Sequence, residues 1–225
     1  MSESPLLTSF LEEILQNNSK HYLWLRSLSY LEYIGYRKMV RAVPYPEVNL
    51  GVFHHLNDEI QHSFILKELA EKSFERPPLR KSALEELVQI AEDYFQGFDS
   101  KIHDWVMEKK NAEDPFLCYL LVSYVIEKRA MRVYPQYFAR LTASPLKMVV
   151  QKIIKEESEH LTYLERVLRR LFHDFSPAVA LLFEFEEVFF EDYLRRMSQY
   201  FDQWIEEPIF KLPTKRSAQN RAATR

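Results

Sequence analysis

The chain has 225 residues, of which 47% are hydrophobic and 28% charged, and its formal net charge is −3. This length and apolar content suffice for one sizeable core, and no shift in composition marks a second one, so we expect a single domain over residues 1–207. The small net charge gives no field that would attract nucleic acid or an anionic membrane surface.

The chain carries no signal for secretion or membrane insertion. Its longest apolar stretch is well short of the ~20 residues that span a bilayer. Its N-terminus lacks the basic start and continuous apolar core of a signal peptide. The single cysteine, Cys118, excludes an intrachain disulfide and a cysteine-rich metal site. We therefore expect a cytoplasmic protein.

The composition favours an all-α fold, because only three glycines occur among long runs of helix-forming residues. Apolar periodicity and boundary residues predict helices over residues 6–15, 23–43, 46–73 and 82–110, with three more that begin near residues 114, 144 and 176. Ser82 is the predicted N-cap of the fourth helix, and Pro135 is expected to bend or end the fifth. The last helix should end near residue 206, and the basic tail 208–225 should be disordered.

Two Glu-x-x-His pairs stand in the chain, Glu59 with His62 and Glu157 with His160, and no other such pair occurs. Residues three apart lie on one face of a helix, so the carboxylate and the imidazole of each pair can reach one point in space. One such pair arises easily by chance on a solvated helix face. Two pairs in a repeated order are a stronger signal for a metal site.

A lone glutamate inside an apolar helical stretch precedes each pair. Glu32 lies 27 residues before Glu59, and Glu127 lies 30 residues before Glu157, which makes a weak internal repeat of two helix hairpins. A carboxylate among apolar neighbours costs several kcal/mol to bury unless a cation compensates it. Four helices that turn these faces inward would hold two metal ions.

With this order of ligands, residues 23–170 resemble the ferritin-like di-iron carboxylate superfamily. The resemblance implies a four-helix bundle with additional helices and a centre of two iron ions, with manganese as the alternative metal. It also implies that Glu59 and Glu157 bridge the two metals. The remaining ligands it implies are Glu32 with His62 on one metal and Glu127 with His160 on the other.

Two acids extend this resemblance beyond the ligands. Asp58 and Glu156 each immediately precede a bridging glutamate. In the bacterial multicomponent monooxygenases, the acid at this position supports the histidine of the opposite hairpin, which would pair Asp58 with His160 and Glu156 with His62. The competing interpretation is that both are surface acids near the site.

Three departures separate the chain from particular members of the superfamily. Ala130 stands where rubrerythrins have an extra glutamate, Leu66 where ribonucleotide reductases have a radical tyrosine, and Ile153 where arylamine N-oxygenases have a histidine. Bacterioferritins share the ligand types but are shorter. The long link between the hairpins and the last helix look more like aldehyde-deformylating oxygenase, the tRNA-modifying hydroxylase of the MiaE type and the quinone hydroxylases.

The resemblance favours an oxygenase or oxidase that uses O2, external electrons and an organic substrate. A ferroxidase, and a ferritin-like protein that stores or senses metal without turnover, are the alternatives. The sequence leaves open the substrate, the electron donor, iron versus manganese, and a homodimer.

Several other features receive a plainer interpretation. His54 and His55 could gate the site, but an exposed helix start is the preferred reading. The acidic run 184–187 is read as a solvent face rather than an iron-binding path. Five tyrosines and the phenylalanines could line a pocket beside the site, although plain core is favoured; the tyrosines are Tyr22, Tyr30, Tyr33, Tyr36 and Tyr124.

Overall fold

The computed structural model describes residues 4–43, 49–142, 144–171 and 175–205. Within these ranges every regular element is an α-helix, which confirms the all-α class. The helices are α1 (Pro5–Leu15), α2 (Asn18–Ala42), α3 (Leu50–Ser73), α4 (Lys81–Lys110), α5 (Pro115–Arg140), α6 (Pro145–Leu171) and α7 (Phe175–Trp204). The predicted disordered tail, residues 208–225, lies outside the described ranges.

Side-chain caps start several helices where the sequence places them. The Asn17 side chain accepts hydrogen bonds from the first backbone N–H groups of α2, and Asp114 does the same for α5, ahead of a proline at the first helical position. Ser144 Oγ accepts from a backbone N–H of α6. These caps satisfy donors that a helix start would otherwise leave unpaired.

Three predicted helix starts were wrong. Helix α4 begins before Ser82, with Arg80 at the N-cap position and no side-chain cap. Helix α2 begins at Asn18, five residues earlier than apolar periodicity indicates, because Asn17 provides the cap. Helix α3 begins at Leu50 rather than at residue 46, because Asn49 provides its cap. Helix α5 continues past Pro135 to Arg140, so this proline does not end it.

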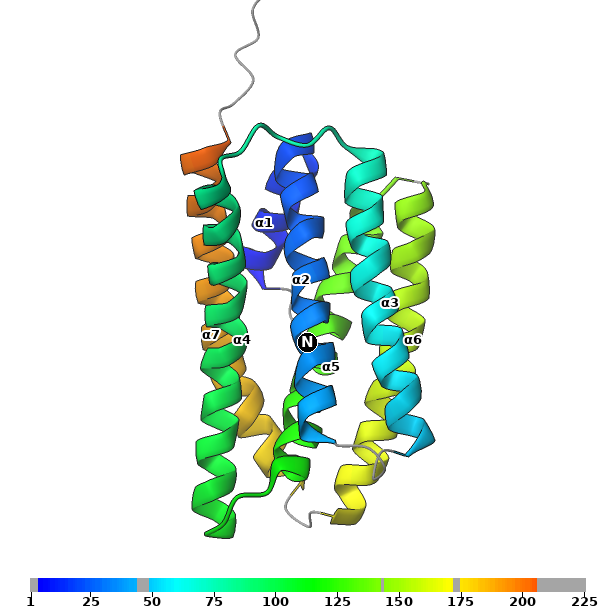
Figure 1. The fold of residues 1–225 in the computed structure, drawn as a ribbon, viewed down its shortest axis with the longest axis vertical. Coiled ribbons are helices and arrows are strands. Elements are labelled where there is room, and N and C mark those ends of the chain that lie inside the picture. Colours follow the sequence, from blue (N-terminus) through cyan, green and yellow to red (C-terminus); the bar gives the residue numbers. More distant parts are fainter. Residues whose placement is uncertain (1–3, 44–48, 143, 172–174, 206–225) are drawn as a thin grey trace, which may run out of the picture.

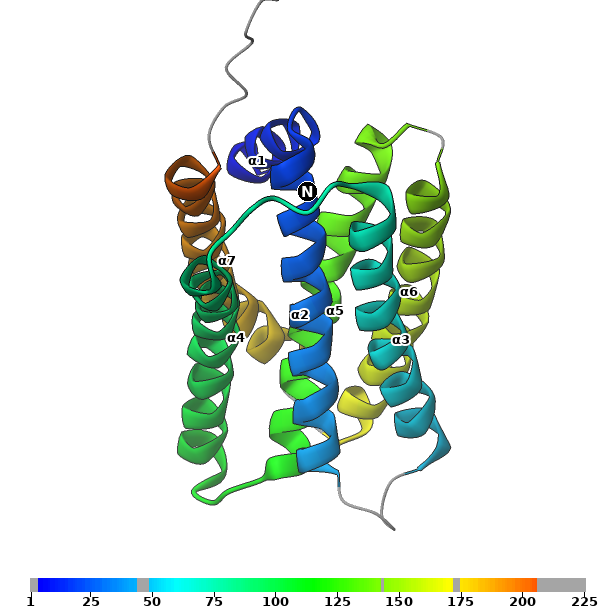
Figure 2. The ribbon, with the colours of Figure 1, turned by 45° about the horizontal axis from the view of Figure 1, so that its top comes forward.

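Six of the seven described helices, α2 to α7, form three pairs that lie side by side (Figures 1 and 2). Helix α2 packs against α3, α5 against α6, and α4 against α7, and the first two pairs face each other as antiparallel hairpins (Figure 1). Residues 74–80 cross from the end of α3 to α4, so the long link between the two hairpins contains α4 (Figure 1). The α4–α7 pair adds a wall over α2 and α5 that a bare four-helix bundle lacks.

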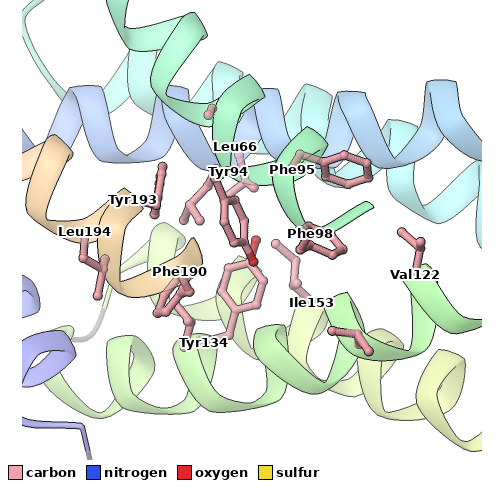
Figure 3. Close-up of a cluster of buried hydrophobic side chains, with 14 of the residues drawn as sticks. Leu66, Tyr94, Phe95, Phe98, Val122, Tyr134, Ile153, Phe190, Tyr193 and Leu194 are labelled. Atoms are coloured by element: carbon pink, nitrogen blue, oxygen red, sulfur yellow. The ribbon is translucent and has the colours of Figure 1, made fainter. Parts of the chain in front are cut away.

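Aromatic side chains fill the space between this wall and the bundle (Figure 3). Tyr94 of α4 packs edge-on against Phe190 of α7, with ring centroids 5.8 Å apart, and lies 5.2 Å from the Tyr193 ring. Such large buried rings contribute much of the apolar area that holds a helix on its neighbours. None of the described helices is both long and apolar enough to cross a membrane.

Candidate metal centre

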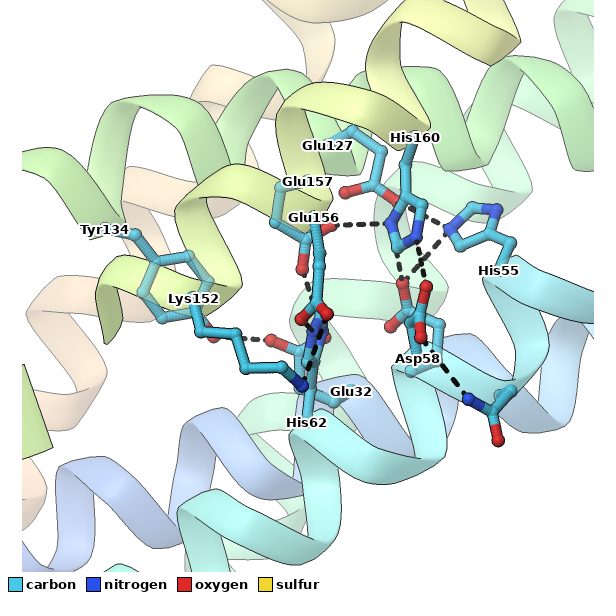
Figure 4. A network of polar contacts seen from close by, with 12 residues as sticks. Glu32, His55, Asp58, His62, Glu127, Tyr134, Lys152, Glu156, Glu157 and His160 are labelled. Carbon is cyan, nitrogen blue, oxygen red and sulfur yellow. Dashed lines mark hydrogen bonds and ion pairs between the residues drawn. The ribbon is translucent and has the colours of Figure 1, made fainter. Parts of the chain in front are cut away.

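Helices α2, α3, α5 and α6 bring all six predicted ligand residues together in the middle of the bundle (Figure 4). Their nitrogen and oxygen atoms form two groups, in each of which the atoms lie within 4.8 Å of one another. One group contains Glu32, Glu59, His62 and Glu157, and the other contains His55, Glu59, Glu127 and His160. The described residues therefore offer two adjacent positions that could hold metal ions.

Glu59 and Glu157 lie between the two positions. Glu59 contributes an oxygen to both groups. Glu157 turns one oxygen toward each predicted histidine ligand, with Oε1 3.0 Å from His62 Nδ1 and Oε2 3.0 Å from His160 Nδ1. These are the placements that a bridging carboxylate needs.

The outward nitrogens of both histidines contact the two acids singled out from the sequence. His62 Nε2 lies 3.0 Å from Glu156 Oε2, and His160 Nε2 lies 3.2 Å from Asp58 Oδ2. Each contact joins α3 to α6, so an acid of one hairpin orients the histidine of the other. Because the outer nitrogen is held by a carboxylate, the inner nitrogen keeps a fixed direction toward the centre.

The electrostatics of the cluster favour a cation. Burial, followed by the charges of neighbouring carboxylates, raises the pKa of Glu32 and of Glu127 well above the usual range. Burial alone would also raise the pKa of Glu157, but hydrogen bonds from Glu127, His160 and His62 outweigh it and hold this pKa well below the usual range. Protons thus offset the crowded negative charge wherever no metal ion does so.

The pKa of His62 also reflects the excess of negative charge in this cluster. Burial lowers its pKa, but the close approach of Glu157 and the charges of other carboxylates raise it to about 11. Its inner atom Nδ1 is buried and faces Glu157 Oε1 at 3.0 Å. Once deprotonated, this nitrogen and the carboxylates around it are donors that suit a metal ion, so the donor set fits the predicted centre.

The apolar neighbours of Glu32 in the sequence suggest that it is fully buried. In the structure it is half-buried. Tyr134 covers it and donates its hydroxyl to Glu32 Oε1. Burial, followed by the charge of Glu32, raises the pKa of Tyr134 well above its usual value, so the phenol keeps its proton. Tyr134 lies two helical turns after Glu127 on the same face of α5, and this spacing was the available signal for it.

The prediction that His55 lies at an exposed helix start was wrong. It is 2% exposed, and its Nε2 lies 2.7 Å from Glu127 Oε1 and 3.1 Å from Glu59 Oε1. Only its neighbour His54 is exposed. His55 precedes Glu59 by four residues, so both lie on the inward face of α3, and this spacing would have placed it in the site.

Two cavities adjoin the carboxylates. One of about 70 Å³ lies between the bundle and the α4–α7 wall, and one of about 20 Å³ lies beside His55. Both reach Glu59 and Glu127. The tyrosines on the larger one are Tyr94, Tyr134 and Tyr193, not the five proposed from the sequence (Figure 3).

The prediction that the acidic run 184–187 on α7 faces solvent was wrong for Glu186. Glu186 is completely buried, and Arg129 of α5 donates to both of its carboxylate oxygens at 2.5 to 3.0 Å. Tyr94 donates to Glu186 Oε1 at 2.6 Å, and Glu187 accepts from Arg129 at 2.8 Å. This cluster joins α7 to the bundle through ion pairs and α4 through the hydrogen bond of Tyr94.

Comparison of the chain with protein-family models, with curated proteins and with solved structures gave no match. The interpretation of the centre therefore rests on its own geometry and chemistry.

Proposed function

We propose that this chain is a di-iron oxygenase of ferritin-like architecture, which activates O2 at a carboxylate-bridged centre and oxidises an organic substrate. The observation that carries the proposal is the pair of donor groups that share Glu59. A single group would suit one ion. Two groups joined by a shared carboxylate suit two ions, and two ions can contact both atoms of one O2 molecule.

The arrangement of the helices supports the ferritin-like part of the proposal. Two antiparallel hairpins, α2–α3 and α5–α6, each contribute one glutamate from their first helix and one Glu-x-x-His pair from their second. This is the distribution of ligands in ferritin-like di-metal carboxylate proteins. Imidazole and carboxylate donors suit iron, and manganese accepts the same ligands.

When bound, two ferrous ions would supply electrons and open coordination positions for O2. The protein orients the ligands from outside, through Asp58 on His160 and Glu156 on His62. Tyr134 holds a proton against Glu32 at the cavity side of the centre. The aromatic wall keeps bulk water away, which protects reactive species formed there.

The larger cavity supports an apolar organic substrate. Its walls are mainly aromatic and aliphatic side chains of α2, α4, α5 and α7, and the four glutamates of the centre lie at one side of it. Trp24 also lines this cavity, and its buried indole N–H has no hydrogen-bond partner. A substrate with an apolar body and one acceptor atom would fit this lining.

The proposed reaction needs a partner that supplies electrons. An oxygenase places one oxygen atom of O2 in the substrate and releases the other as water, which takes up two electrons and two protons. The substrate donates two further electrons in the oxidation. An external donor, such as a small redox protein, must therefore reduce the centre before each turnover.

Iron stoichiometry and O2 uptake test the proposal. Anaerobic loading with excess Fe²⁺ should leave two ions per chain, and O2 should then oxidise these two ions and no more. Glu157→Ala should abolish binding of the pair, whereas Glu159→Ala, at an exposed position two residues away, should not. Oxidation of many iron ions per chain with formation of mineral would instead indicate a ferroxidase, and absence of bound metal would refute the centre.

A further inference from the structure

The imidazole ring of His55 is oriented differently at the candidate metal centre from the rings of the two predicted ligands, His62 and His160. His62 and His160 face the carboxylates with Nδ1 and contact an acid with Nε2. His55 faces the carboxylates with Nε2, and its buried Nδ1 has no hydrogen-bond partner. Among the described residues no acid contacts Nδ1 of His55, so packing and the inner contacts hold its ring.

The distances around His55 fit coordination of a shared ion. A metal that holds nitrogen and oxygen ligands at about 2.1 Å and at right angles sets neighbouring ligand atoms about 3.0 Å apart. His55 Nε2 lies 2.7 Å from Glu127 Oε1 and 3.1 Å from Glu59 Oε1, close to this spacing. The same two oxygens lie 3.8 and 3.9 Å from His160 Nδ1.

These four atoms, from three helices, surround one point. A histidine that served only as a hydrogen-bond donor would need one carboxylate acceptor, whereas His55 Nε2 lies between two. The rings of His55 and His160 pack with centroids 4.1 Å apart, which fixes both on the same side of that point. The small cavity lined by His55, Glu59 and Glu127 adjoins it.

We propose that His55 is a seventh metal ligand and that it makes the two metal positions unequal. This inference rests on the proposed di-metal centre and adds a residue that the six-ligand pattern lacks. The position at His55 and His160 then has two imidazoles with Glu59 and Glu127, and Glu157 Oε2 also faces it. The position at His62 has one imidazole with Glu32, Glu59 and Glu157.

The unequal donors predict unequal selectivity. Imidazole favours iron, cobalt and zinc, whereas carboxylate oxygens suit manganese as well. The two-histidine position should therefore fill first with Fe²⁺ or Co²⁺ and should discriminate against Mn²⁺. The position with one histidine should bind more weakly and discriminate less.

Cobalt provides a probe that needs neither O2 nor turnover. Loading the protein with Co²⁺ should proceed in two separable steps in the visible absorption spectrum. In the proton NMR spectrum of the loaded protein, each ligating imidazole gives one strongly shifted ring N–H signal that disappears in D2O. The wild-type protein should show three such signals, and His55→Gln should show two, with the first cobalt ion bound at least tenfold more weakly.

Removal of a residue that only orients a metal ligand lowers metal affinity by about 10–100-fold. Removal of a ligand itself should therefore lower it at least tenfold. His54→Gln is the matched control, because His54 is the exposed neighbour of His55 and should change neither the signals nor the affinities. Circular dichroism of each variant establishes that it is folded.

Two bound cobalt ions with only two shifted N–H signals in the wild-type protein would overturn the proposal while leaving the di-metal centre intact. Unchanged affinities in His55→Gln would overturn it as well. Conversely, three signals in a protein that fails to consume O2 would support His55 as a ligand and refute the oxygenase. The two proposals therefore fail by different observations.

Discussion

Helix α5 carries two buried clusters of ionisable side chains on opposite faces. Glu127 points toward α3 and α6, into the candidate metal centre, and Arg129, two residues later, points toward α4 and α7. Residues two apart on a helix do not face each other. One helix thus contributes to two charge clusters whose chemistry can be compared directly.

The clusters differ in how their charge is compensated. Arg129 meets Glu186 through two nitrogens, and Tyr94 donates a further hydrogen bond, so the cation and the anion offset each other within the protein. The candidate metal centre contains four glutamates. In the absence of metal ions, bound protons offset their negative charge. The Arg129–Glu186 cluster is compensated by charges of the protein itself and holds helices together, whereas the carboxylate cluster could also be compensated by bound cations.

The largest effect should come from breaking the complete cluster. Arg129→Met leaves Glu186 buried without its partner, which should lower the free energy of unfolding by about 3–5 kcal/mol. The loss should be the same with and without metal ions. Urea denaturation of the metal-free and metal-loaded protein measures both values.

The double variant Arg129→Met with Glu186→Leu removes both charges and should recover much of this loss. If the single variant were as stable as the wild type, the Arg129–Glu186 cluster would not stabilise the packing of α4 and α7 on the bundle.

The metal centre should respond to added metal by a smaller amount. At a free Fe²⁺ concentration 100 times the Kd, a single binding site stabilises the fold by about 2.7 kcal/mol. Anaerobic thermal unfolding should show this stabilisation in the wild type and not in Glu157→Ala. The Arg129→Met variant should keep the metal-dependent increment, because its cluster lies on the other face of α5.

The metal-dependent increment should also depend on pH. The raised pKa values of Glu32 and Glu127 mean that the metal-free fold is favoured below the usual carboxylate range and loses this contribution as the pH rises. Metal ions compete with these protons and with the proton on His62, whose pKa is raised to about 11. The rise in Tm on metal addition should therefore be larger at about pH 8 than at about pH 5.5.

Replacement of an outer acid should have a graded effect. Glu156→Gln removes the charge that orients His62, and metal affinity should fall by about 10–100-fold. Isothermal titration with Co²⁺ measures this change. Glu156 is half-buried and also contacts Lys152, so the metal-free stability should change little. An unchanged affinity would mean that the contact does not orient the ligand.

The smallest effect on the metal-free protein should come from Glu127→Gln. Burial and neighbouring carboxylates raise the pKa of Glu127 well above its usual range, so a neutral amide in its place should change the free energy of unfolding by less than about 1 kcal/mol. Metal binding should nevertheless be lost. A strongly destabilised metal-free variant would show that Glu127 serves the fold rather than the centre.

The sequence predicted the helices and the gathering of six side chains because both depend on short-range periodicity. Spacings of three residues place Glu59 with His62 and Glu157 with His160 on common helix faces, and apolar neighbours turn these faces inward. His55 was equally accessible at four residues from Glu59. It was missed because it lies beside His54 near the start of a helix.

Other features depend on contacts that local patterns do not encode. Arg129 and Glu186 are 57 residues apart, and their pairing follows from the packing of α7 against α5. The cavity lining follows from the same wall, which brings Tyr94 and Tyr193 beside the centre in place of the tyrosines on α2. The Ser82 prediction failed because α4 begins at Lys81 with no side-chain cap, a shift of one to two residues that local patterns do not determine.

Mössbauer spectroscopy of the protein loaded anaerobically with ⁵⁷Fe²⁺ and then exposed to O2 tests the central claim most directly. A carboxylate-bridged pair predicts two ferric ions per chain that are magnetically coupled, so the same sample should give no ferric EPR signal. Isolated high-spin ferric ions with a full EPR signal, or iron below two ions per chain at saturation, would contradict it.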